Sequence, residues 1–355
     1  MNRLGAYRVD RRKKNSIYLE TLKAMSNLSI QRGVNSLFFP GGTRSRSGEL
    51  ESDLKMGLLG TAVEAQRAMC QKGAKSGGGE GRPAPPVSKV FIVPVVICYN
   101  FVLEAPFLIE QHLRSTGKEN YIRLKDEGKS IRGWLRFVWR FFTTTSDITL
   151  SIGKPMDVLG NFVDERGRSF DRFHNELDIQ DYFTSKREVN EDRQREEEYT
   201  KLLAERIAER YQVENVALSS HLVAYAVFEM LLHQHPKLDL FGLLRLPPDD
   251  YVFPFSAVED VVEQMQTKLL ELEQFGKIRV APELYRAAGD VVREGVKNLG
   301  IFHSEKPLVF NKEGNITSSN FRVLYFYHNR LHSYGLDKAV HWKAQQHVEV
   351  FVDGE

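Results

Sequence analysis

The sequence predicts an α/β fold, in which helices cover a sheet, followed by a mostly helical C-terminal region. Three apolar runs of strand character, at residues 34–39, 89–100 and 147–155, alternate with segments of helical periodicity. Beyond about residue 160 the pattern changes to long helical stretches without a detectable repeat. We therefore expect one domain over residues 1–160 and a helical region over residues 161–355.

Composition limits the functions that the chain can have. Its 355 residues, 42% hydrophobic and 27% charged, suit a folded protein with a large core. The net charge of +2 argues against a general nucleic-acid binder, but residues 1–50 hold ten basic and three acidic residues, a local net charge of +7. That excess suits a phosphate-bearing ligand or an anionic membrane surface.

Cysteine content and hydropathy exclude other classes. Two cysteines, Cys70 and Cys98, are too few for a disulfide framework, and no metal-ligand spacing is recognisable, so we expect neither a metal nor a resident cofactor. The sequence has no signal peptide, and none of its apolar runs approaches the roughly 18 residues of a transmembrane helix. The expected compartment is a reducing one.

The N-terminal elements follow from capping and periodicity. Residues 15–32 are predicted as a helix, because Asn15 or Ser16 can cap its start and Gly33 can end it. Residues 34–39 are predicted as a strand that leads into PGGTRSRSG, residues 40–48. Helical periodicity returns from Leu54 to Met69.

The middle of the chain alternates between flexible and regular segments. Residues 72–86 are rich in glycine and proline and are predicted as a flexible insertion. The buried strand at 89–100 contains Pro94, which belongs at a strand end, an edge or a bulge. A further strand is predicted at residues 147–155.

The C-terminal half is predicted to be mostly helical from residue 215 to 340. It is preceded by a charged helix, residues 185–211, with an apolar face at a spacing of four residues: Tyr199, Leu203, Ile207 and Tyr211. His221 lies in the apolar run SSHLVAYAVF and is interpreted as a residue of a core helix.

The segment PGGTRSRSG has two interpretations. Gly41 and Gly42 allow a sharp turn that exposes backbone N–H groups, and the guanidinium groups of Arg44 and Arg46 match phosphate oxygens two at a time. Taken alone, a surface turn with solvent-facing arginines is the commoner explanation. The neighbouring segments favour a phosphate pocket.

Four segments in order resemble blocks of the glycerolipid acyltransferase family, which includes glycerol-3-phosphate and 1-acylglycerol-3-phosphate acyltransferases. GAYRVDR (residues 5–11) is similar to the family's Gly-x-x-Phe-Ile-Asp-Arg, and FPGGTRS (39–45) is similar to its Phe-Pro-Glu-Gly-Thr-Arg-Ser. The extension RSG (46–48) favours the glycerol-3-phosphate branch, and VPV (93–95) resembles the family's Ile/Val-Pro-Val strand.

The resemblance covers residues 1–160 well and the remainder thinly. KMGLLGTA (55–62), with a lysine before a helix, fits the same order, and LYFYHNRLHSY (324–334) resembles a Tyr-Tyr-Arg-Asn-x-x-x-His segment near the end of such enzymes. The family implies a mixed sheet covered by helices.

The implied reaction transfers a fatty acyl group from acyl-CoA or acyl carrier protein to a hydroxyl of glycerol 3-phosphate or of 1-acylglycerol 3-phosphate (lysophosphatidate). By resemblance the substrate-binding residues are Arg11, Gly41, Gly42, Thr43, Arg44, Ser45, Arg46 and Pro94. The arginines would hold the phosphate, and the hydroxyl groups would add hydrogen bonds. For Pro94, a simple strand terminator is an equally good interpretation.

Two departures from the family bear on catalysis. Its first block, His-x-x-x-x-Asp, supplies a general base oriented by a carboxylate, and none of the four residues before Gly5 is a histidine. We therefore assign no catalytic residue and expect an internal or misassigned start, with a non-catalytic lipid- or phosphate-binding protein as the alternative. His332 to Asp337 matches the spacing but lies in the wrong place, and Gly41 replaces the usual glutamate.

The expected location is cytoplasmic, at the inner face of a membrane. RGWLRFVWRFF (residues 132–142) mixes aromatic residues with arginines, as segments at a bilayer surface do, although an amphipathic core helix would have the same pattern. A nucleic-acid partner is not expected.

Overall fold

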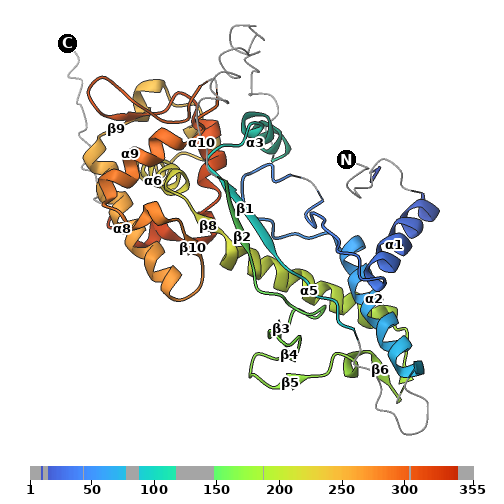
Figure 1. Ribbon diagram of the computed structural model, residues 1–355. Helices are drawn as coiled ribbons and strands as arrows, with labels where there is room; N and C mark the ends of the chain where they lie inside the picture. Colours follow the sequence, from blue (N-terminus) through green and yellow to red (C-terminus); the bar gives the residue numbers. More distant parts are fainter. Residues whose placement is uncertain are drawn as a thin grey trace, which may run out of the picture. The chain divides into compact units, whose positions relative to one another are not determined.

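The computed structural model describes residues 9–10, 15–42, 44–76, 88–116, 148–186, 188–303 and 305–342 (Figure 1). It has mixed α and β structure, as the sequence predicts. The chain forms two compact units, and each is built from separate segments. Unit 1 comprises Met1–Arg44, Glu51–Pro94 and Ile152–Tyr211, and unit 2 comprises Ser45–Leu50, Val95–Ser151 and Gln212–Glu355.

Two predicted helices open unit 1 and pack against one another: α1 (Ser16–Gln31) and α2 (Met56–Ser76). The Asn15 side chain caps α1 by accepting a hydrogen bond from the Ile17 amide at 2.8 Å, as the capping pattern predicts. Helix α2 continues to Ser76, so residues 72–76 of the predicted insertion are helical; the remainder of that insertion, 77–86, lies outside the described residues.

The predicted strand at residues 34–39 is not formed. Its apolar side chains remain largely exposed, with Leu37 at 83% and Phe39 at 76%, and only Phe38 packs against the core of unit 1. A strand needs a neighbour for its backbone hydrogen bonds, and no described strand pairs with this segment. The apolar run therefore leads to the glycine pair as irregular backbone.

The rest of unit 1 consists of short antiparallel strands and a long helix. Strands β3 (Phe162–Val163), β4 (Ser169–Phe170) and β5 (Glu176–Leu177) form one sheet, and β6 (Thr184–Ser185) pairs with β7 (Glu188–Val189). Helix α5 (Arg193–Glu214) buries Leu203 and Ile207 in the core, with Tyr199 and Tyr211 packed at its edge. This confirms the predicted apolar face.

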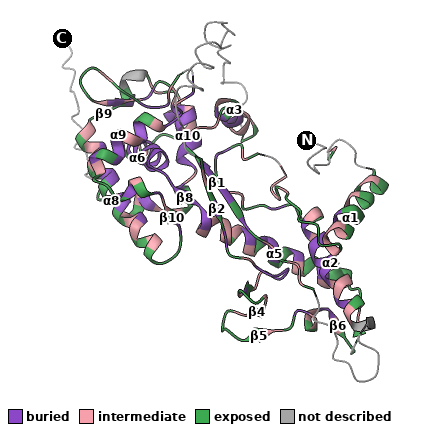
Figure 2. Cartoon of the chain, in the orientation of Figure 1, coloured by how far each residue is buried: buried purple, intermediate pink, exposed green. Residues whose placement is uncertain are grey.

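Unit 2 is organised around helix α6 (Ser219–Gln234), which is buried from Ser219 to Leu231 (Figure 2). It is surrounded by α8 (Phe255–Gln274), α9 (Ala288–Asn298) and α10 (Phe321–His328), as Figure 1 shows. Helices α3 (Ala105–Ser115) and α7 (Leu240–Leu243) complete this mostly helical region. The prediction for residues 215–340 is confirmed.

The strands of unit 2 are also short. β1 (Val95–Tyr99) pairs with β2 (Ile148–Ile152), and β8 (Val216–Ala217) runs parallel to β10 (Arg279–Val280). A third sheet has the order β11 (Val309–Phe310), β12 (Ile316–Thr317), β9 (Val252–Phe253).

Together, the described strands form five separate sheets of two or three strands, not the single mixed sheet that was expected. The predicted strand at 89–100 is shortened to β1, because Pro94 lacks the N–H that a continuous ladder needs. Across the described helices, none combines the length and the apolar character that a bilayer crossing requires.

Candidate functional site

The predicted glycine turn is present in unit 1. The Gly42 amide donates to the Phe39 carbonyl at 3.0 Å, and the Lys55 amide donates to the Pro40 carbonyl at 2.8 Å. Gly42 has φ of +73°, a conformation that favours glycine. The second of these hydrogen bonds attaches the turn to Lys55, the residue that precedes α2.

An acidic side chain lies beside Gly41. A Cβ atom at position 41 would overlap the carboxylate of Glu51, and one at Gly42 would lie 2.8 Å from Cδ of Lys55. The two glycines therefore leave room for the side chains of Glu51 and Lys55. Burial, and secondarily the charge of Asp53, raise the pKa of Glu51.

Glu51 is a residue that the sequence analysis missed. The resembled pattern has glutamate at the position of Gly41, and here a glutamate ten positions later occupies the adjoining space. The spacing of residues in the sequence does not predict that Glu51 lies beside Gly41, because this contact depends on how the chain folds back after Gly48.

The other predicted binding residues are distributed as follows. Arg44 is exposed in unit 1, and Arg46 is exposed in unit 2. Pro94 ends its segment of unit 1, where its carbonyl accepts a hydrogen bond from the Gly153 amide at 2.8 Å. This placement at a strand end is one of the three that the sequence predicted. Arg11, Thr43 and the aromatic segment 132–142 lie outside the described residues.

Residues Ser45–Leu50 form a tight turn in unit 2. The Ser45 hydroxyl donates to the Glu49 carbonyl at 3.0 Å and accepts from the Gly48 amide at 3.1 Å. This hydroxyl, which the resemblance assigns to the ligand, therefore closes the turn. Gly48 is buried with φ of +89°, and a Cβ there would overlap the carbonyl oxygen of Phe326 on α10.

The turn is fastened to the C-terminal segment that the sequence analysis singled out. The Asn329 side chain donates from Nδ2 to the Ser47 carbonyl at 2.8 Å, and both groups are buried. Segments 46–48 and 324–334, which are separated by most of the chain, thus meet within unit 2. Sequence order alone gave no reason to expect this contact.

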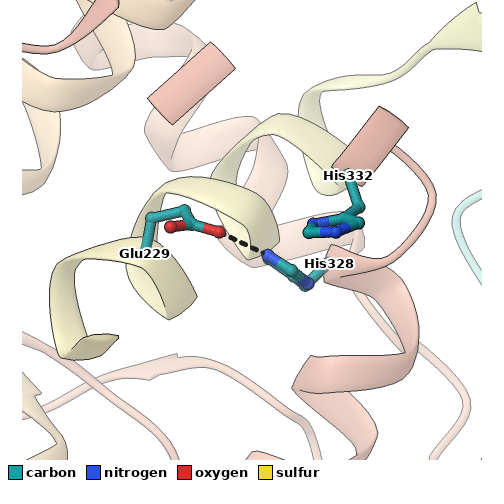
Figure 3. A group of neighbouring side chains, drawn as sticks. All are labelled: Glu229, His328 and His332. Atoms are coloured by element: carbon teal, nitrogen blue, oxygen red, sulfur yellow. Dashed lines mark hydrogen bonds and ion pairs between the residues drawn. The ribbon is translucent and has the colours of Figure 1, made fainter. Parts of the chain in front are cut away.

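Beside Asn329 lies a cluster of Glu229, His328 and His332 (Figure 3). His328 ends α10, and its Nε2 lies 2.8 Å from Oε1 of Glu229 on α6. Its Nδ1 lies 2.9 Å from Oδ1 of Asn329, and its ring stacks on Tyr225 with a centroid distance of 4.7 Å. Glu229 and His328 are buried, whereas His332 is exposed.

Asp337 and His221 have structural roles in unit 2. Asp337, the acid that follows His332 at the family spacing, accepts a hydrogen bond from the Tyr225 hydroxyl at 3.0 Å. His221 is buried on α6, as predicted, and burial followed by the charge of Arg330 lowers its pKa to about 3. A neutral, enclosed imidazole of this kind belongs to the core.

No model of a known protein family matches the chain, and no curated protein matches it either.

Proposed function

We propose that this chain is an O-acyltransferase that transfers a fatty acyl group from acyl-CoA or acyl carrier protein to a hydroxyl of glycerol 3-phosphate or 1-acylglycerol 3-phosphate. The observation that carries the proposal is the hydrogen bond from Asn329 to the Ser47 carbonyl. It joins two segments, 46–48 and 324–334, that each resemble a segment of the same enzyme family.

The proposal takes its phosphate-binding residues, among them Arg44 and Arg46, from the sequence resemblance. Both arginines are exposed, and a guanidinium group matches phosphate oxygens two at a time. Lys55 lies over the Gly42 backbone and adds a third cation next to the turn. Glu51, beside Gly41, takes the part of the family's glutamate and orders the basic groups or bonds the ligand hydroxyl.

The proposed reaction joins the acceptor oxygen to the thioester carbonyl carbon and breaks the carbon–sulfur bond. The proton of the acceptor hydroxyl leaves with the thiol, and a general base speeds this transfer by about 10² to 10⁴. His328 does not serve as that base in the arrangement described, because both of its ring nitrogens are occupied by Glu229 and Asn329. The proposal therefore assigns binding groups and no general base.

A non-catalytic phosphate- or lipid-binding protein is the second candidate function. One observation favours it. Among the described histidines, the one that hydrogen-bonds a carboxylate is His328, which is buried and has a partner for each of its ring nitrogens. Both candidates place the chain in phospholipid synthesis or recognition, at the cytoplasmic face of a membrane where acyl-lipid products are released.

An acyl-transfer assay separates the two candidates. Labelled acyl-CoA, or acyl carrier protein, is supplied with glycerol 3-phosphate, and esterified product is counted for the wild type and for Arg44→Ala and Arg46→Ala. We expect each substitution to lower kcat/KM by about 10-fold or more, because it removes a charge-assisted contact to phosphate.

The control is Arg32→Ala, which removes an exposed arginine just after α1 and should leave the rate unchanged. Transfer that is unaffected by the Arg44 and Arg46 substitutions would contradict the proposed site. Binding of glycerol 3-phosphate without any transfer would favour the non-catalytic candidate.

A further inference from the structure

We propose that Glu229, His328 and His332 form a binding site for a divalent transition-metal ion of the zinc type, with one coordination position open to solvent. Each residue offers one ligand atom, and the three atoms lie within 4.8 Å of one another (Figure 3). Two imidazole nitrogens and one carboxylate oxygen are a ligand set that Zn²⁺ accepts when three protein groups leave a fourth position for water. This site does not depend on the acyltransferase proposal.

The elements that carry the ligands favour this arrangement. His328 and His332 are four residues apart, at the end of α10 and the start of the 3-10 turn His332–Tyr334, so both rings lie on the same side of the chain. Their ring centroids are 5.7 Å apart. Glu229 reaches the pair from the neighbouring helix α6.

The hydrogen bonds around His328 fix the direction of its ring. Asn329 donates from Nδ2 to the Ser47 carbonyl, so its Oδ1 faces Nδ1 of His328 as an acceptor at 2.9 Å. The other ring nitrogen, Nε2, is thereby directed at Glu229, whose Oε1 lies 2.8 Å away.

The surroundings supply the support that metal ligands ordinarily have. The bond from Nδ1 to Asn329 is the outer hydrogen bond that fixes the tautomer and direction of a ligating histidine. Stacking on Tyr225 and a second ring contact with Phe228, at a centroid distance of 4.4 Å, hold the imidazole plane.

Access to the site comes through His332. Its ring is exposed, so solvent reaches the cluster on this side, and a bound metal ion would replace the present contact between His328 Nε2 and Glu229. A bound ion would connect α6 to the 324–334 segment. Through Asn329 it would also steady the turn at residues 45–50.

The test is metal binding to the purified, chelator-treated chain, with Zn²⁺ alone measured by calorimetry and Co²⁺ by visible absorption. We expect one ion per chain and, with Co²⁺, the strong visible bands of four-coordinate cobalt. His332→Asn should weaken Zn²⁺ binding at least about 10-fold and abolish these bands. Because His332 is exposed, this substitution leaves the core intact, and circular dichroism and the melting temperature verify that.

The matched control is His341→Asn, an exposed histidine of unit 2 outside the cluster, which should bind Zn²⁺ as the wild type does. Glu229→Gln, a nearly isosteric change, should also lower the affinity. No binding of one ion per chain by the wild type, or equal affinity in the His332→Asn and wild-type chains, would overturn the proposal and leave Glu229 and His328 as a buried ion pair.

Discussion

At the scale of single residues, Gly41 and Gly42 are important because they have no side chain. Each lets a charged side chain from further along the chain, Glu51 or Lys55, lie against the backbone of the turn. The sequence correctly predicted a glycine turn here. It could not identify Glu51 as the neighbouring acid, because that depends on the return of the chain after residue 48.

The buried side chain of His303 should make the stability of the protein depend on pH. Its Nε2 forms a hydrogen bond of 2.9 Å with the Tyr327 hydroxyl, which also accepts a hydrogen bond from the Val102 amide at 3.0 Å. Burial lowers the pKa of His303 to about 4 from its usual 6.5. The unfolded chain therefore binds a proton between these two pH values, whereas the folded chain does not.

Stability should accordingly fall as the pH falls from 6.5 towards 4. We expect the wild type to lose about 2 kcal/mol more free energy of unfolding between pH 7 and pH 5 than His303→Gln, which keeps an acceptor but does not titrate. Urea unfolding at the two pH values measures this difference. Equal losses in the two proteins would mean that His303 is protonated or exposed in the folded chain.

At the scale of elements, the strongest predictions were the helices. Capping and periodicity predicted α1, α2 and α5 because these signals lie within one segment. The prediction of a strand at 34–39 was wrong, because an apolar run does not show whether a partner strand exists. The same reason explains why five small sheets appear in place of one: strand pairing is set by distant segments.

The attachment of the 45–50 turn to α10 predicts a specific cost at Gly48. An added Cβ there meets the backbone carbonyl of Phe326, which has no side-chain freedom to move away, and φ is +89°. We expect Gly48→Ala to lower the free energy of unfolding by at least about 3 kcal/mol.

Gly314→Ala is the matched control for backbone strain. Gly314 has φ of +83° with nothing within 4 Å of an added Cβ, so the substitution should cost only about 1 kcal/mol. Denaturant unfolding of the two variants gives both values. An equal loss of unfolding free energy in the two variants would show that Gly48 does not pack closely against α10.

At the scale of the whole molecule, the described chain has two cores, one in each unit. The core of unit 2 holds α6 and α10, and so positions the Glu229, His328 and Asn329 side chains. The core of unit 1 holds α2 and α5, and the turn at 39–42 is attached at the start of α2. Composition and periodicity predicted abundant core material, but the interleaving of chain segments in the two units arises from long-range contacts that no local pattern encodes.

The cluster of Glu229, His328 and His332 illustrates the same limit. Glu229 and His328 are 99 residues apart and carry no motif, so the sequence predicted no metal. Only the four-residue spacing of His328 and His332 offered a local signal, and it is a weak one.

The central claim is that residues 41–48 hold the phosphate of a glycerol phosphate, and calorimetric titration of the chain with glycerol 3-phosphate tests it most directly. We predict saturable binding of one molecule per chain, competition by inorganic phosphate, no binding of glycerol, and at least about 10-fold weaker binding by Arg44→Ala and Arg46→Ala than by Arg32→Ala. Absence of binding by the wild type, or equal affinity in all three variants, would contradict the claim.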